Sequence, residues 1–103
     1  MGWDFARGGL VEVAPRKGSA GLAEALGRVL AAPGTVYAQG LAVGLVGVSN
    51  AHGLGWRVEV VSPAVVRVEC RARRGLGPWC VTVVRRGDWT AQGGVVEALM
   101  GLT

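Results

Sequence analysis

Arginines gather in one stretch of the sequence and are the first residues to consider for chemistry. Residues 67–86 hold six arginines and one acidic residue, Glu69, so this stretch carries a net charge of +5. The whole chain carries +4, and the remainder therefore sums to −1. Guanidinium groups beside an exposed aromatic ring can bind phosphates and stack on bases. The predicted nucleic-acid- or anion-binding residues are Arg67, Arg71, Arg73, Arg74, Trp79, Arg85 and Arg86.

A second interpretation of these arginines stays open. The chain has no Ile and a single Lys, Lys17, as expected of a GC-rich gene in which Arg replaces Lys and Val replaces Ile. The arginines would then form the solvated outer face of a strand. Trp79 is the only aromatic residue among them, and one ring does not make a stacking platform.

Cysteine and histidine offer little for metal binding or nucleophilic catalysis. Cys70 and Cys80 are ten residues apart, which matches no zinc-binding spacing, and His52 is the only histidine. Within strands, both thiols are expected to pack as small hydrophobic groups, and a cross-strand disulfide would require an oxidising compartment. We predict no metal and no cofactor.

The remaining polar residues form no catalytic pattern. The seven carboxylates are scattered, no serine lies in a Gly-x-Ser-x-Gly sequence, and the glycine pairs lack the context of a phosphate-binding loop. His52 lies in a predicted loop with few acidic residues near it. The sequence therefore predicts that the protein is not an enzyme and has no small-molecule substrate.

Four tryptophans are many for a chain with one Tyr and one Phe. Trp56 is expected in the core, whereas Trp3, Trp79 and Trp89 lie near a terminus or near strand ends. Tryptophan is a frequent anchor of protein interfaces, so we predict these three as interface residues. Alternatively, they close the ends of a small core and donate their ring N–H groups to backbone carbonyls.

The first secondary-structure element predicted along the chain is a strand at Leu10–Val13. Ser19 is expected to cap a helix that ends at Ala32-Pro33-Gly34. Its apolar stripe follows helical spacing and consists of Leu22, Ala25, Leu26, Val29 and Leu30.

Further strands are predicted at Thr35–Ala38, Leu41–Val48, Trp56–Val60, Val66–Ala72 and Trp79–Arg86. Leu41–Val48 is apolar on both faces, as a central strand would be, and two glycines disfavour a helix there. Cys70 is placed opposite Cys80, with Arg67 on the face of Val81 and Val83. A last helix follows a Thr90 cap, with a stripe of Val95, Val96, Leu99 and Leu102. The predicted fold is one small α+β domain over residues 1–103, with about five antiparallel strands packed against a helix from the N-terminal half and a C-terminal helix.

Composition and charge limit the classes of function that the protein can have. Only 17% of residues are charged, against about 25% in typical domains. One explanation is the composition of a GC-rich gene, and the other is apolar surface that a partner or another copy covers. The longest apolar run, 41–48, is too short to span a membrane, and the N-terminus does not resemble a signal peptide. The sequence predicts a non-catalytic structural or adaptor module in the cytoplasm, or in a particle assembled there. It would self-associate or dock a protein partner, for instance in a ring or virion-type particle, with nucleic-acid binding through residues 67–86 as the alternative.

Overall fold

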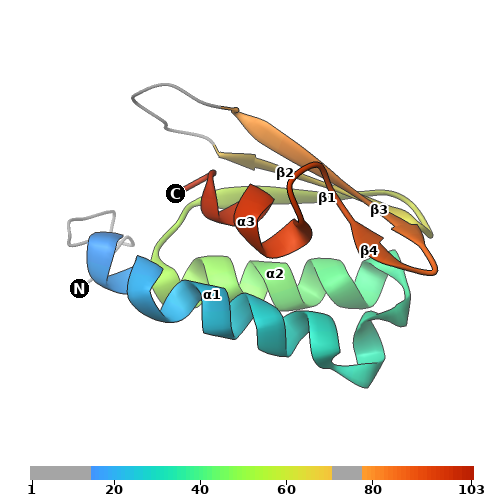
Figure 1. The fold of residues 1–103 in the computed structure, drawn as a ribbon, viewed down its shortest axis with the longest axis horizontal. Helices are drawn as coiled ribbons and strands as arrows, with labels where there is room; N and C mark the ends of the chain where they lie inside the picture. The colour runs from blue at the N-terminus through green and yellow to red at the C-terminus, as the bar shows by residue number, and fades with distance from the viewer. Residues whose placement is uncertain (1–14, 71–77) are drawn as a thin grey trace.

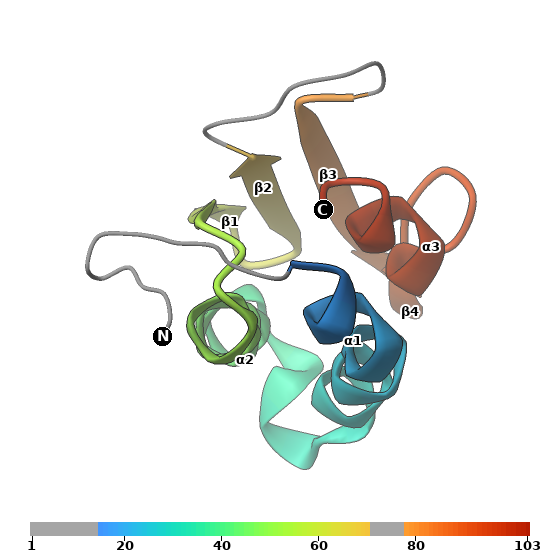
Figure 2. The same cartoon turned by 90° about the vertical axis from the view of Figure 1, so that its left-hand side faces the viewer.

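A computed structural model describes residues 15–70 and 78–103. The elements follow the order α1 (Pro15–Ala31), η1 (Pro33–Val36), α2 (Ala38–His52), β1 (Trp56–Ser62), β2 (Val65–Cys70), β3 (Cys80–Arg86), β4 (Asp88–Thr90) and α3 (Val95–Met100). The helices lie on one face of a four-stranded antiparallel meander (Figures 1 and 2). The α+β class is confirmed, with four strands in the described part of the chain instead of about five. The strand predicted at Leu10–Val13 lies outside the described residues.

Helices η1 and α2 occupy the stretch for which the sequence predicts two strands, Thr35–Ala38 and Leu41–Val48, and both predictions are wrong. Thr35 belongs to the 3-10 helix η1, and the residues from Ala38 onward form α2. An apolar run that fits a central strand also fits a helix packed on two sides, so its periodicity could not separate the two. The buried positions follow helical spacing and are Ala38, Leu41, Ala42, Leu45, Val48 and Ser49.

The glycines that disfavour a helix at this place are the residues that let α2 pack closely. A Cβ on Gly44 would lie 2.6 Å from Cγ1 of Val29 in α1. A Cβ on Gly40 would collide with the backbone carbonyl of Gly34. The helix-propensity cost, about 1 kcal/mol per glycine, is offset by the close packing of α1 and η1 against α2.

Helix α1 confirms the predicted stripe, because Leu22 and Leu26 are fully buried. It begins at Pro15, however, and Ser19 therefore lies within the helix instead of capping it. A proline suits the first turn because its missing N–H would have no helical partner there. The helix ends at Ala31, just before Pro33, as predicted.

The register of β2 and β3 differs by one residue from the prediction. Cys80 lies opposite Glu69, and the backbone N–H of Cys70 donates to the carbonyl of Trp79 at 2.8 Å. The shift places Val81 and Val83 opposite Val68 and Val66, on the face that packs against the helices. Because a one-residue slip would turn these valines to solvent, core burial sets the register. Arg67 therefore shares a face with Cys80 and Thr82.

The C-terminal helix confirms the predicted buried positions Val95, Leu99 and Leu102. It begins after Gly94, and the predicted cap residue Thr90 belongs to β4. Trp56 joins this end of the chain to the sheet, since its buried ring Nε1–H donates to the carbonyl of Leu102 at 3.3 Å.

Gly44 and Gly47 provide a matched test of the helix packing. We expect Gly47→Ala to raise the free energy of unfolding by about 0.5–1 kcal/mol, because no atom beyond the adjacent residues and the backbone of α2 itself lies within 4 Å of the new methyl group. Gly44→Ala gains the same helix propensity but collides with the stiff side chain of Val29, and overpacking costs about 1–3 kcal/mol. Denaturant unfolding at one protein concentration checks both variants. Equal stabilisation by the two would contradict the close contact between α1 and α2.

Candidate functional site

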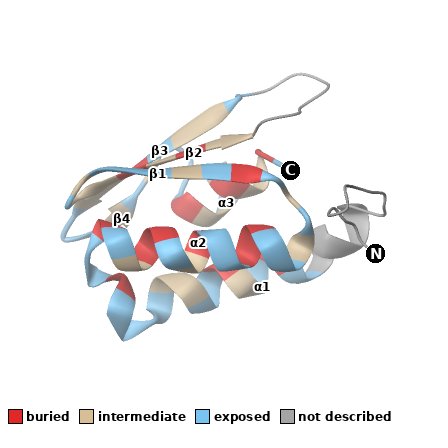
Figure 3. Cartoon of the chain, turned by 180° about the vertical axis from the view of Figure 1, so that it is seen from behind, coloured by how far each residue is buried: buried red, intermediate tan, exposed pale blue. Residues whose placement is uncertain are grey.

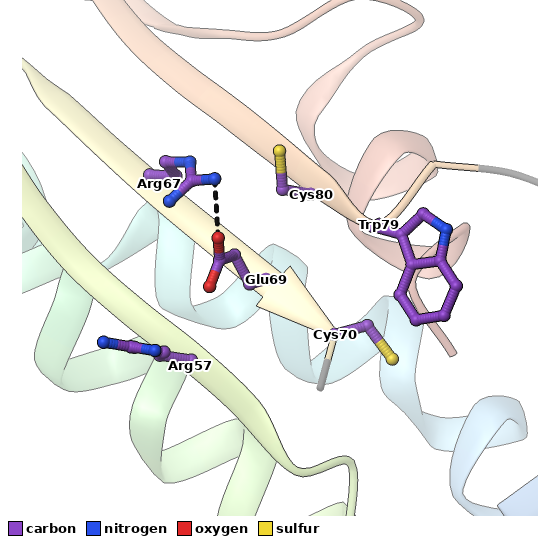
Figure 4. Close-up of a pocket in the computed structure, with 6 residues that line it drawn as sticks. All are labelled: Arg57, Arg67, Glu69, Cys70, Trp79 and Cys80. Carbon is purple, nitrogen blue, oxygen red and sulfur yellow. Dashed lines mark ion pairs between the residues drawn. The ribbon is translucent and has the colours of Figure 1, made fainter. Parts of the chain in front are cut away.

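Arg67 lies on the sheet face that the helices leave uncovered, between two carboxylates. It forms an ion pair with Glu69 of its own strand (Figure 4). Its Nη1 also lies 3.8 Å from Oε1 of Glu59 in β1. The Glu69 carboxylate raises the pKa of Arg67 above its ordinary value; slight burial opposes this, while Cys80 and Glu59 add to it. Arg67 thus stays charged, and two neighbouring carboxylates already balance its charge.

The charges of this uncovered face are balanced by cross-strand neighbours throughout the described part of the sheet. Each arginine of the face has an acidic residue as its Cα partner on the next strand: Arg57 faces Glu69, Arg67 faces Glu59, and Arg86 faces Asp88. Opposite charges at such positions stabilise a strand pair. The face is therefore an alternating charge pattern and carries no excess positive charge in the described residues.

The structure does not bring the described members of the predicted arginine set into one cluster. Arg85 and Arg86 alternate along β3, so Arg86 lies on the face of Arg67, whereas Arg85 lies on the other face with Trp89 as its cross-strand partner. The other members, Arg71, Arg73 and Arg74, lie outside the described residues.

Trp79 is the most exposed tryptophan in the described part of the chain, with 54% of its surface accessible. It lies just before β3, opposite Cys70, and borders a shallow, open hollow of about 360 Å³ at the end of the sheet. Its neighbours around the hollow are Arg57, Arg67, Glu69, Cys70 and Cys80 (Figure 4). Among these charged groups, Arg67 and Glu69 form an ion pair, and Arg57 lies opposite Glu69 in the strand register.

Trp89, the second predicted interface residue, is half-buried and faces the helices. Its ring Nε1–H donates to the carbonyl of Thr35 at 2.7 Å and so joins β4 to η1. This contact is the structural role that the sequence offers as the alternative for the tryptophans. Trp3, the third predicted interface residue, lies outside the described residues.

The two thiols are free and half-buried. Successive side chains alternate across a strand, and the observed register puts Cys70 on the helix-covered face and Cys80 on the uncovered one. His52 belongs to the last turn of α2. Over residues 15–70 and 78–103, no three His, Cys, Asp or Glu side chains gather as metal ligands would, and no helix combines the length and apolar character needed to cross a bilayer.

A surface that the sequence did not predict lies where β1 and α2 form one side of the molecule. Helix α2 contains no Asp, Glu, Lys or Arg, yet Val43 is 69% exposed and Val46 is 42% exposed. Val46 follows Gly44 by two residues, a little more than half a turn, so it points away from α1. In Figure 2, β1 lies above α2, and α1 lies to the right of α2, so the flank is the left-hand side of that view. Figure 3 shows β1 and α2 together from behind.

The outer edge of β1 belongs to the same flank. Within the described residues β1 pairs with β2 alone, so its other edge is open. The Cys70–Trp79 bond shows that Cys70, and by alternation Val68 and Val66, direct their backbone groups to β3. Glu69 and Arg67 then bond to β1. The β1 residues whose N–H and C=O groups point to the open edge are therefore Trp56, Val58 and Val60. We call the open edge of Trp56–Val60 together with Val46 the β1–α2 flank.

One sequence signal could have revealed this flank. The run 41–48 has more apolar residues than one helix face can bury, so treating it as a helix leaves Val43 and Val46 on the surface. A central strand would bury side chains on both of its faces, so predicting a strand for this run left no apolar residue to be exposed.

Comparison with known proteins gives no match to a family model, to a curated protein or to a solved structure.

The placement of the thiols on opposite sheet faces makes a prediction about oxidation. We expect a mild oxidant to leave the native monomer without an internal disulfide, because the two side chains point apart. Intact-mass measurement on dilute protein checks this, since a disulfide removes two hydrogen atoms. The chain oxidised in denaturant serves as the control that can form the bond. Loss of two hydrogens from the native monomer would contradict the register of β2 and β3.

Proposed function

We propose that the protein is a non-catalytic structural or adaptor module that self-associates through the β1–α2 flank. One observation carries the proposal: Val46 is exposed on an uncharged helix that packs against β1, on the side away from α1, and the outer edge of β1 has no partner in the described sheet. An open strand edge is a template for pairing with another chain, and natural proteins usually protect it with charge, proline or a covering element. Adjacent exposed apolar side chains are typical of interaction surfaces.

The energetics of the flank support an association surface. Full burial of a valine side chain is worth about 1.5 kcal/mol, at the low end for large apolar side chains. Val46 and Val60 are 42% and 44% exposed, and covering both would contribute on the order of 1 kcal/mol per copy. Backbone bonds along Val58 and Val60 would add to this gain.

The uncovered sheet face supports the non-catalytic part of the proposal. Its described charges are cross-strand pairs, which stabilise the sheet and leave few groups free to act on a ligand. We propose that the module acts in the cytoplasm or in a particle assembled there. Nucleic-acid binding depends on Arg71, Arg73 and Arg74, and no contact of the described residues favours it.

Light scattering coupled to size-exclusion chromatography tests the proposal. We expect the wild-type protein to show a mass above the 10.6 kDa of one chain at micromolar concentration. Val46→Asp places a charge in the flank, so it should shift the protein towards the single-chain mass while leaving the far-ultraviolet circular dichroism unchanged.

Ala23→Asp is the matched control, because Ala23 is exposed on α1 away from the flank and the added charge is the same. This variant should keep the wild-type mass. A wild-type protein that is a single chain at every concentration would overturn the proposal, as would a Val46→Asp protein with unchanged mass. Absorbance at 260 nm in the same run reports bound nucleic acid, and its release in high salt would instead favour the arginine-rich segment.

A further inference from the structure

We infer that the second copy binds antiparallel to β1 about a two-fold axis at Val58, so that Arg57 of each copy meets Glu59 of the other. This inference rests on the proposed self-association and specifies its geometry. Three observations carry it: the backbone groups that β1 leaves at its edge, the order of charges along the strand, and the apolar side of α2 beneath it.

The backbone of the open edge suits a two-fold pair centred on Val58. In an antiparallel ladder, opposite residues that both face the seam exchange two hydrogen bonds, so Val58 would exchange two with Val58 of the partner copy. The N–H of Val60 would donate to the carbonyl of Trp56 in the partner copy, once on each side of the axis. The N–H of Trp56 is not needed, because it already donates to Oγ of Ser49 at 2.9 Å.

The charges of Arg57 and Glu59 favour a two-fold axis at Val58 over an axis at either neighbouring residue. A centre at Arg57 would place two arginines face to face, and a centre at Glu59 would do the same with two carboxylates. Like charges directly opposite each other destabilise strand pairs. The centre at Val58 instead forms two Arg57–Glu59 pairs and keeps all five residues of 56–60 in the ladder.

The same register continues the charge pattern already present on the uncovered face. Within one copy, Arg57 lies opposite Glu69 and Glu59 lies opposite Arg67. Across the seam, a row would run from Glu69 to Arg57 and then to Glu59 and Arg67 of the partner copy. The signs alternate along the whole row, so each charge meets an opposite one at every step.

The ends of the edge limit the pairing to this segment. A register shift between Val60 and Ser62 interrupts the ladder at the far end of β1, and such irregularities protect strand edges. At the near end, Gly55 has φ of +67° and turns the chain out of the strand. Beneath the seam, Val46 points away from α1, so the two α2 helices would each supply an apolar side chain under the joined sheets.

Charge reversal and mixing test the register. Arg57→Glu alone places two carboxylates opposite each other across the seam, and Glu59→Arg alone places two guanidinium groups there. We expect each variant to dimerise about tenfold more weakly than wild type at low ionic strength, because two attractive cross-strand pairs become repulsive. An equimolar mixture of the two variants should recover tight association as heterodimers, detected by native mass spectrometry. The control is Arg28→Glu, an equal charge change on α1, which should dimerise as wild type does.

The outcomes separate this inference from the function on which it rests. A wild-type protein that stays monomeric overturns both. A wild-type dimer whose affinity does not change in either variant, or whose variants are not rescued by mixing, overturns the register and leaves self-association standing. A monomer that dimerises only after residues 1–14 are deleted would make that segment the occupant of the edge, and would also overturn the inference.

A backbone variant gives an independent check. Val58→Pro removes the N–H that faces the open edge, and the β1–β2 ladder does not use that group. We expect Val58→Pro to be a folded monomer by circular dichroism and light scattering. A folded Val58→Pro dimer would overturn the pairing, and if this variant does not fold, the mixing experiment decides alone.

Discussion

The burial of Trp56 is the constraint on which the rest of the structure depends. Its backbone N–H donates to Oγ of Ser49 at the end of α2, and its ring N–H donates to the carbonyl of Leu102 near the C-terminus. These bonds join the helical hairpin, the first strand and the end of the chain around one side chain. Because side chains alternate along a strand, fixing Trp56 inward also fixes Val58 inward and turns Arg57 and Glu59 to the uncovered face. The inward position of Trp56 therefore determines which side chains of β1 face the helices and which lie on the uncovered face.

A second junction fixes the opposite end of the sheet. The ring N–H of Trp89 donates to Thr35, and the backbone N–H of Ala38 at the start of α2 donates to the carbonyl of Pro63 in the turn between β1 and β2. Helix α2 is thus bound to the sheet at both ends and runs beneath β1. This arrangement explains why an open strand edge and an apolar helix side lie on the same flank.

The sequence predicted correctly those elements whose spacing of apolar residues fits only one type of secondary structure. The stripe of α1, the alternation of β1 and β2 and the buried positions of α3 all depend on local spacing, and the structure confirms them. The prediction for α2 was wrong because this helix is buried on two sides, so no contrast between a polar and an apolar face marks it as a helix. Gly44 also lowers the helix propensity of the segment, but in the structure it permits contact with Val29.

The predicted register of β2 and β3 was wrong for a related reason. Matching Cys70 with Cys80 ignored the valines, whose burial decides which residues face each other. The acidic partners of Arg57 and Arg67 come from neighbouring strands, so a charge count along the chain could not reveal the balance.

Amide hydrogen exchange of β1, followed by NMR at several protein concentrations, distinguishes a free strand edge from one that pairs between two copies. The account predicts that the amides of Val58 and Val60 exchange rapidly in dilute protein and become protected as the concentration rises, because they bond only across the seam between two copies. The amides of Arg57 and Glu59 bond to β2 within one copy and should be protected throughout. Protection of Val58 and Val60 that does not change with concentration would contradict the account.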